Sequence, residues 1–213
     1  MTLIANIRFN TCPDTTIING LNQQLVKELD LLIPGKLLRL DDGTLNVSFS
    51  DPARLLPFIG GPTAKARLKT AIDNRGVTLR VNSAYRTFAQ QYLLFREHHS
   101  GHPTKCGISA VARPGTSNHE SGLALDIQNP MTWRPFLEFS GLGWRWFGPK
   151  DTPHYDFVAG GTDLRKFGIM AFQKLWNKHN PSDKLVVDGD LGGANWQNSE
   201  TIKRLLKTPI DGF

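Results

Sequence analysis

Residues 117–126 read Ser-Asn-His-Glu-Ser-Gly-Leu-Ala-Leu-Asp. This segment carries the imidazole of His119 and, further along, the carboxylate of Asp126. A histidine nitrogen and a carboxylate oxygen both bind zinc at about 2.0–2.2 Å. Seven extended steps of about 3.3 Å would hold His119 and Asp126 more than ~20 Å apart, so the chain must fold back if both are to bind one ion. We expect that turn at Ser121 and Gly122. The alternative is an ordinary surface histidine beside a capping residue at a turn.

The segment that follows, residues 122–128, has the pattern of a half-buried strand. Large apolar residues stand at positions 123, 125 and 127, and they alternate with Ala124, Asp126 and Gln128. Alternate side chains of a strand point to opposite faces, so Asp126 is predicted to face away from the core. A metal ligand at this position would rest on a strand whose packed face holds it still.

A third candidate ligand lies in residues 151–157, Asp-Thr-Pro-His-Tyr-Asp-Phe. In a strand that begins after the proline, His154 and Asp156 share one face, and Tyr155 and Phe157 share the other. Two histidines and one carboxylate leave the fourth tetrahedral position of zinc open, as in catalytic zinc sites.

Asp151 is the candidate catalytic base. Water activated by a metal needs a group that takes its proton during attack on a carbonyl, and a carboxylate three residues before a ligand can reach the open position. The alternative is that Asp151 is a turn residue before Thr-Pro.

These segments resemble a known family. The pattern SxHxxGxAxD is the signature of VanY-like zinc D-Ala-D-Ala metallopeptidases, which act on peptidoglycan stem peptides. Every fixed position of the signature is present in this chain: Ser117, His119, Gly122, Ala124 and Asp126.

The resemblance implies a hedgehog-like or DD-peptidase-like α+β fold with an antiparallel sheet and flanking helices. It also implies one zinc ion on His119, Asp126 and His154. The later Asp-x-Pro-His segment, preceded by Trp-rich residues 143–146, resembles the branch that contains L-alanyl-D-glutamate endopeptidases. Related dipeptidases and carboxypeptidases usually carry Glu at the base position, so Asp151 favours the endopeptidase branch.

A second segment supports the resemblance. Residues 77–87 alternate as a strand and end in Ser-x-Tyr-Arg-Thr, and Thr87 fits the start of a capped helix. By resemblance, Arg86 binds a substrate carboxylate or stabilises the oxyanion, for which its charged planar fork is suited. The resemblance also assigns Gln91 and Ser117 to substrate binding. The alternatives are a salt-bridged surface arginine and a glutamine that flanks the core of its helix.

The organisation predicted for the whole chain is a catalytic domain, residues 1–160, followed by a small module, residues 161–213. The catalytic domain is expected to begin with a helix over residues 21–33 and a hairpin over residues 36–50. A helix over residues 63–75 precedes the strand that ends near Arg86. A short helix or loop over residues 130–140 is expected to pack Trp133, Phe136 and Phe139 against the core.

The C-terminal module resembles a helical peptidoglycan-binding module. It shows a helix ending in Phe-Gln, a turn with the pattern DGxxG, and a last helix opened by Thr201. The alternative is a helical extension that packs on the enzyme.

Composition agrees with a wall-acting protein. The net charge of +6 and the pI near 9.5 favour an anionic partner such as peptidoglycan. The basic residues are scattered, which argues against nucleic-acid binding. Cys12 and Cys106 have no CxxC spacing, so no thiolate metal site is expected.

The sequence also predicts where the protein acts. No apolar run reaches the length of a membrane span, and the N-terminus lacks the pattern of a secretory signal. We therefore expect a monomer made in the cytoplasm that reaches the wall after release or lysis, as phage endolysins do.

The sequence thus predicts a zinc-dependent peptidoglycan peptidase, with L-alanyl-D-glutamate endopeptidase activity preferred. Two alternatives stay open. One is a D-alanyl-D-alanine carboxypeptidase, and the other is a zinc-containing wall-binding module without catalysis.

Overall fold

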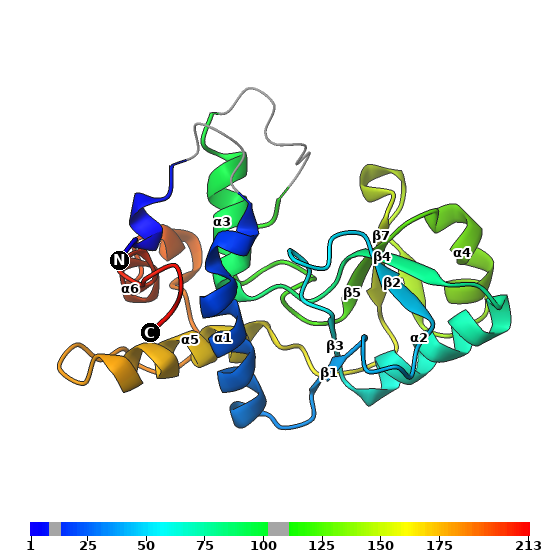
Figure 1. The fold of residues 1–213 in the computed structure, drawn as a ribbon, viewed down its shortest axis with the longest axis horizontal. Coiled ribbons are helices and arrows are strands. Elements are labelled where there is room, and N and C mark those ends of the chain that lie inside the picture. The colour runs from blue at the N-terminus through cyan, green and yellow to red at the C-terminus, as the bar shows by residue number, and fades with distance from the viewer. Residues whose placement is uncertain (9–13, 102–110) are drawn as a thin grey trace. The chain divides into compact units, whose positions relative to one another are not determined.

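The computed structural model describes residues 1–8, 14–101 and 111–213, so Cys12 and Cys106 lie outside the described residues. The chain divides into two compact units (Figure 1). We call residues 34–86 and 118–164 the sheet unit. Residues 1–33, 87–117 and 165–213 form the helical unit.

Within the described residues, the sheet unit contains a five-stranded sheet in the order β2-β4-β5-β7-β6 and a two-stranded sheet of β1 and β3. β2 runs parallel to β4, whereas the other neighbours in the large sheet are antiparallel. The strands are β1 (Leu37–Arg39), β2 (Val47–Phe49), β3 (Phe58–Gly60), β4 (Leu79–Ser83), β5 (Ala124–Ile127), β6 (Trp144–Trp146) and β7 (His154–Phe157). The predicted α+β class is confirmed, and the sheet is antiparallel except at its β2 edge.

The alternation of β5 and β7 separates an apolar face from a polar one. Leu125, Ile127 and Tyr155 are buried in the hydrophobic core of the unit. Asp126 and His154 lie opposite each other in the antiparallel ladder, on the other face. The strand pattern predicted from the sequence therefore places both polar residues at one position of the sheet.

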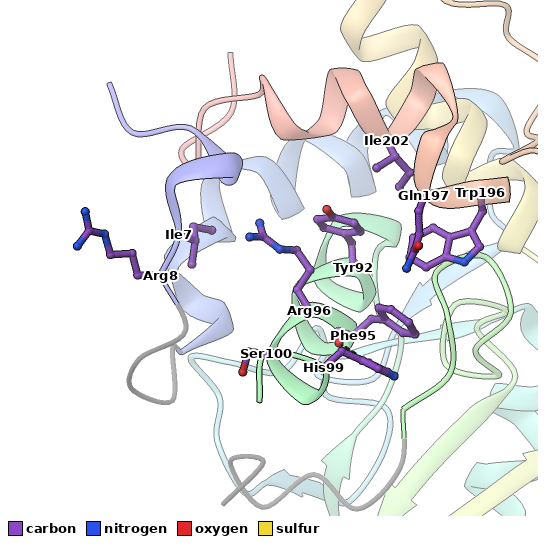
Figure 2. Close-up of a pocket in the computed structure, with 10 residues that line it drawn as sticks. All are labelled: Ile7, Arg8, Tyr92, Phe95, Arg96, His99, Ser100, Trp196, Gln197 and Ile202. Atoms are coloured by element: carbon purple, nitrogen blue, oxygen red, sulfur yellow. Dashed lines mark hydrogen bonds between the residues drawn. The ribbon is translucent and has the colours of Figure 1, made fainter. Parts of the chain in front are cut away.

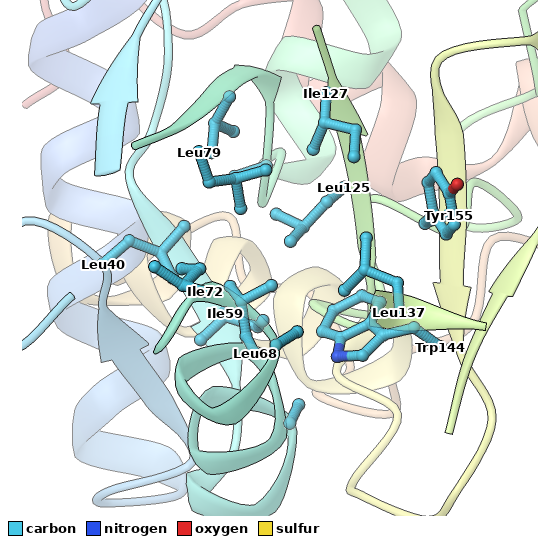
Figure 3. Close-up of a cluster of buried hydrophobic side chains, with 14 of the residues drawn as sticks. Leu40, Ile59, Leu68, Ile72, Leu79, Leu125, Ile127, Leu137, Trp144 and Tyr155 are labelled. Atoms are coloured by element: carbon cyan, nitrogen blue, oxygen red, sulfur yellow. The ribbon is translucent and has the colours of Figure 1, made fainter. Parts of the chain in front are cut away.

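Two helices complete the core of the sheet unit (Figure 3). Leu68 and Ile72 come from α2 (Pro62–Arg75), and Leu137 comes from α4 (Pro130–Leu137). α2 ends at Gly76, whose φ of 70° is a left-handed conformation that glycine adopts at little cost. The predicted helix over residues 63–75 is thus present with its expected cap.

One packing prediction for residues 130–140 is wrong. Trp133 is buried and Phe136 packs against the core, as expected. Phe139 is 68% exposed, because α4 ends at Leu137 and the chain turns away from the core. The Phe139 ring instead lies 4.8 Å from the guanidinium carbon of Arg134.

The predicted hairpin over residues 36–50 is also wrong. Asp42 does form a tight turn, since its Oδ1 accepts a hydrogen bond from the backbone N–H of Thr44 at 3.1 Å. However, β1 pairs with β3, and β2 pairs with β4. Leu40 and Leu45, which flank the turn, are both buried in the core, so packing draws the two arms to different sheets.

The helical unit is built from four α-helices and three short 3₁₀ helices within the described residues. They are η1 (Ile4–Asn6), η2 (Thr15–Ile18), α1 (Asn19–Leu32), α3 (Phe88–His98), α5 (Arg165–His179), η5 (Gly193–Asn198) and α6 (Glu200–Leu206). This unit has its own hydrophobic core, which includes Leu21 of α1, Phe88 of α3 and Phe172 of α5. Among the described helices, none is long and apolar enough to cross a membrane.

This division differs from the predicted boundary after residue 160. Residues 1–33 and 87–117 pack with residues 165–213, because the apolar faces of α1 and α3 are buried against α5. The N-terminal helix therefore belongs to the helical unit and not to the sheet unit. That residues 161–213 bind peptidoglycan stays a prediction.

Helix caps agree in part with the sequence. Thr87 caps α3, since its Oγ1 accepts from the backbone N–H of Gln90 at 3.1 Å. α6 is capped by Ser199, whose Oγ accepts from Ile202 N–H at 3.2 Å. Thr201, predicted to open this helix, lies inside it and is buried, so that prediction is wrong by two residues.

Candidate metal centre

The turn between His119 and β5 forms where the sequence predicts it. The backbone N–H of Gly122 donates to the carbonyl of His119 at 3.2 Å. Gly122 has a φ of 75°, and a Cβ there would lie 2.9 Å from Leu164 Cδ1 and 3.0 Å from Gly60 Cα. Only glycine fits this position without displacing its neighbours.

The fold brings the three predicted metal ligands together. His119 Nε2 lies 3.3 Å from Asp126 Oδ1, and His154 Nδ1 lies 2.9 Å from the same oxygen. One possible ligand atom from each residue falls within 4.8 Å of the others. Donors about 2.0–2.1 Å from a tetrahedral zinc ion would be roughly 3.3 Å apart, so this set fits one ion after small adjustments.

Hydrogen bonds outside the cluster orient both imidazoles. His119 Nδ1 lies 2.7 Å from the carbonyl oxygen of Ala84, which can only accept, so Nδ1 carries the proton and Nε2 is left as an acceptor. His154 Nε2 lies 3.0 Å from Asp156 Oδ1. In both rings, the nitrogen that faces Asp126 is the one available to a metal.

Burial and charge set the protonation of the cluster. Burial favours the neutral carboxyl of Asp126, but His119 and His154 hold its pKa well below the usual range. Burial lowers the pKa of His119, and the charge of Arg86 lowers it further. Burial also opposes charge on His154, yet the hydrogen bonds that its ring donates to Asp126 and Asp156 raise its pKa to about 9. The zinc-free site therefore holds an ionised carboxylate beside an imidazole that is protonated near neutral pH, and a metal ion would have to displace that proton.

Asp151 lies beside the metal-facing atoms. It ends η4 (Pro149–Asp151), and its Oδ2 is 4.0 Å from His154 Nδ1. Its side chain is 51% exposed, so water and substrate can reach it. Partial burial raises its pKa, and the neighbouring charge of Asp126 acts in the same direction. A carboxylate with a raised pKa is suited to exchange protons near neutral pH.

Arg86 is tied to the cluster by its backbone and by its side chain. Its backbone N–H donates to the carbonyl of His119 at 3.2 Å. Its guanidinium donates to Ser83 Oγ through Nε and Nη2, at 3.1 and 2.8 Å, and Nη2 lies 3.5 Å from Asp126 Oδ2. Arg86 thus places a fixed positive charge next to a predicted metal ligand.

Gln91 and Ser117 belong to the helical unit. Gln91 is fully buried, and its Nε2 donates to the carbonyl of Ala112 at 2.8 Å. Ser117 is also buried. Their assignment to substrate binding stays a prediction.

Three residues that sequence reasoning left without a role also reach the cluster. Asn118 Nδ2 donates a hydrogen bond to Asp156 Oδ1 at 2.9 Å, and the same oxygen of Asp156 faces the His154 ring. The ring of Phe147 lies 5.3 Å from the His154 ring, edge to face, and is 51% exposed. The shared strand face of His154 and Asp156 was the only sequence signal for any of them.

The helical unit has a pocket of its own, with a volume of about 720 Å³ (Figure 2). Tyr92, Phe95 and Trp196 form its aromatic side, and the guanidinium carbon of Arg96 lies 5.8 Å from the Tyr92 ring. Its size is within the ~300–1,000 Å³ usual for small-ligand pockets. None of the predicted site residues is among its described lining residues, so it is not the site that the motif predicts.

Comparison with known proteins gives a match to a family and a likeness to a solved structure. Residues 62–142 match the family described as VanY: D-alanyl-D-alanine carboxypeptidase. The match includes Arg86, His119 and Asp126 and ends before Asp151 and His154.

A similar solved structure is that of the LdcB LD-carboxypeptidase, which reveals the molecular basis of peptidoglycan recognition by that enzyme. It is 24% identical in sequence, with a TM-score of 0.43, over 62% of this chain and 72% of the other. No curated protein matches the chain. The resemblance to the VanY family that the motif predicts is therefore confirmed over residues 62–142.

Proposed function

We propose that this protein is a zinc-dependent peptidase that hydrolyses amide bonds of peptidoglycan stem peptides, at positions that involve D-amino acids. The observation that carries the proposal is the convergence of His119, Asp126 and His154 beside Asp151 and Arg86. A ligand set, a candidate base and a fixed cation in one place are the parts that metal-assisted hydrolysis needs.

The donor atoms favour zinc over harder cations. Two imidazole nitrogens and one carboxylate oxygen suit zinc, whereas magnesium and calcium prefer sets made of oxygen atoms. One bound ion would supply Lewis-acid polarisation of the scissile carbonyl and a lowered pKa for water.

The residues around the ion would then have separate roles in hydrolysis. Asp151 would accept a proton from the attacking water and pass it to the leaving amine, for which its exposure and its raised pKa are suitable. Arg86 would stabilise the oxyanion that forms on the carbonyl, because its guanidinium is held by Ser83 next to Asp126. Phe147 would offer an apolar surface to a small side chain of the stem peptide.

The preferred specificity is L-alanyl-D-glutamate endopeptidase. The support for it is Asp151, an aspartate where related carboxypeptidases usually carry glutamate. The match to the family of D-alanyl-D-alanine carboxypeptidases supports the second candidate, which is that activity. Mass spectrometry of digested peptidoglycan distinguishes the two, since the endopeptidase exposes a new N-terminal D-glutamate or D-isoglutamine and the carboxypeptidase releases free D-alanine.

A non-catalytic zinc protein is the alternative from another class. Replacing Asp151 with Ala is expected to abolish hydrolysis while the bound zinc persists, because Asp151 is not one of the proposed ligands. Lys150→Ala, in the same turn, is the matched control and should keep full activity. Hydrolysis at the normal rate in the Asp151 variant would contradict the mechanism, and a wild-type protein that binds zinc but cuts nothing would favour the alternative.

We also propose that the predicted C-terminal module, residues 161–213, retains the protein on peptidoglycan once it has reached the wall. The basic composition of the chain and the module resemblance support this. The full-length Asp151→Ala variant is expected to sediment with purified sacculi, with and without zinc. If it stays in the supernatant at low ionic strength, the wall-binding role is wrong.

A further inference from the structure

His154 has a carboxylate at each of its two ring nitrogens. Nδ1 lies 2.9 Å from Asp126 Oδ1, on the side where the other two predicted ligands meet. Nε2 lies 3.0 Å from Asp156 Oδ1, on the opposite side of the ring. The two carboxylates therefore cannot have the same role, because only the first shares its side with His119.

Asp156 is itself held in place. It is a buried residue of β7, and the oxygen that faces His154 also accepts a hydrogen bond from Asn118 Nδ2 at 2.9 Å. Arg145, its partner across the β6–β7 ladder, has Nη2 at 4.0 Å from Oδ2. A carboxylate on a paired strand, with a donor on one oxygen and a cation near the other, has little freedom to leave the ring.

The bond at Nε2 decides which atom His154 presents. In the metal-free protein each ring nitrogen faces a carboxylate acceptor; if a metal ion takes the place of the proton at Nδ1, the acceptor at Nε2 holds the remaining proton and leaves the Nδ1 lone pair to the ion. Without this acceptor, the proton could reside on Nδ1, or the ring could turn by half a rotation and present a carbon. Either change would remove a ligand from the centre.

We propose that Asp156, supported by Asn118, is a positioning residue that presents His154 to the metal through Nδ1. The inference rests on the proposed metal centre and adds the coordinating atom and the residue that selects it. Asp156 touches neither the ion nor the substrate in this arrangement. Partners of this kind contribute about 10–100-fold to metal affinity in other proteins.

The test is zinc affinity, measured by competition with a chelator of known affinity. Asp156→Ala is expected to weaken zinc binding about 10–100-fold. Asp156→Asn keeps an oxygen that can accept from Nε2–H, so its loss should be clearly smaller. Asp73→Asn, on the exposed surface of α2, is the matched control and should bind zinc as tightly as the wild type. Circular dichroism of the zinc-free variants establishes that each is folded.

The second readout is the tautomer of His154, from nitrogen-15 NMR of the zinc-loaded protein. The wild type is expected to show a proton on Nε2 and metal on Nδ1, and Asp156→Ala should show exchange between ring states. Equal zinc affinity in Asp156→Ala and the wild type would overturn the positioning role and leave the proposed function intact. Equal losses in the Asn and Ala variants would also overturn it, because charge and not the hydrogen bond would then be responsible. A wild type that binds no zinc would overturn the metal centre and this inference together.

Discussion

The helical unit and the sheet unit both bury polar side chains, but they satisfy them differently. In the helical unit, Gln173 is buried, and its Nε2 donates to Asp188 Oδ1 and Thr201 Oγ1 at 2.9 and 3.1 Å. Its Oε1 accepts from the backbone N–H of Gly189 at 2.9 Å. Donors meet acceptors here, and the side chain at the centre is neutral.

In the sheet unit, titratable side chains gather instead. His154 lies between Asp126 and Asp156, and Asp151 approaches to 4.0 Å. The pKa values of several groups in this cluster are displaced from their usual ranges. The Gln173 network holds one carboxylate, Asp188, whose pKa is lowered by hydrogen bonds, first of all from the backbone N–H of Asp190, and its central amide carries no charge.

The difference separates a polar network that supports a fold from one suited to function. Matched hydrogen bonds around a neutral amide rigidify a core, and several titratable groups clustered with displaced pKa values are typical of sites that bind ions or move protons. Variants in the two networks should therefore affect different properties.

The largest effect is expected for a metal ligand. His119→Ala removes one of three proposed donors, so the protein should lose stoichiometric zinc, and hydrolysis should fall by about 1,000-fold or more, since a Lewis-acid metal supplies several kcal/mol. Zinc content by mass spectrometry and the rate of stem-peptide cleavage check this. His179→Ala, in the helical unit, is the matched control, and normal activity in His119→Ala would show that the cluster is not the active site.

Arg86 should matter for rate more than for zinc content. Arg86→Ala is expected to lower kcat about 100–1,000-fold, as loss of an oxyanion donor does in other enzymes, while zinc stays bound. Arg86→Lys keeps the charge but loses the planar fork that Ser83 holds, so it should recover only part of the rate. A change confined to KM would contradict the oxyanion role and favour binding of a substrate carboxylate.

The sequence was sufficient to place the proposed metal ligands because local rules determine their positions. The glycine turn and the alternation of β5 place Asp126 on the polar face, and the same alternation in residues 154–157 places His154 there. Arg86 could be placed at a strand-to-helix junction from the strand pattern and the Thr87 cap. Antiparallel pairing of the two strands then brings the ligands together.

Other features depend on contacts that no local pattern encodes. The partner of β2 is chosen by burial of Leu40 and Leu45, not by the turn that precedes the strand. The role inferred for Asp156 depends on how the His154 ring is rotated, although their shared face was predictable. Packing of the N-terminal helix against α5 likewise depends on tertiary contacts between distant segments.

A Gln173 variant tests the polar network of the helical unit, because it should change the stability of the protein and leave the proposed metal centre unchanged. Gln173→Ala leaves buried partners without hydrogen bonds, so the free energy of unfolding should fall by about 1–3 kcal/mol. Denaturant unfolding measures this, with the exposed Gln197→Ala as the matched control. The zinc affinity of the folded protein should not change, and a large loss of zinc binding would show that the two networks are not independent.

The smallest effect is the pH dependence of zinc stabilisation. The pKa of His154 is raised to about 9, so its contribution to the stability of the zinc-free protein is fully present below about pH 6.5 and is lost as the pH rises through 9. Zinc must displace that proton below pH 9, and the two carboxylates hydrogen-bonded to His154, Asp126 and Asp156, have lowered pKa values and stay ionised across this range, while Asp151 lies 4.0 Å from Nδ1 with a raised pKa. The zinc-induced increase in Tm, measured at a fixed free zinc concentration, should therefore grow by a few degrees between pH 6.5 and 9.

Asp156→Asn should reduce this dependence of the Tm increase on pH, because it removes one of the two carboxylates that raise the pKa of His154. An increase in Tm that is the same at both pH values would mean that zinc does not compete with a proton on His154.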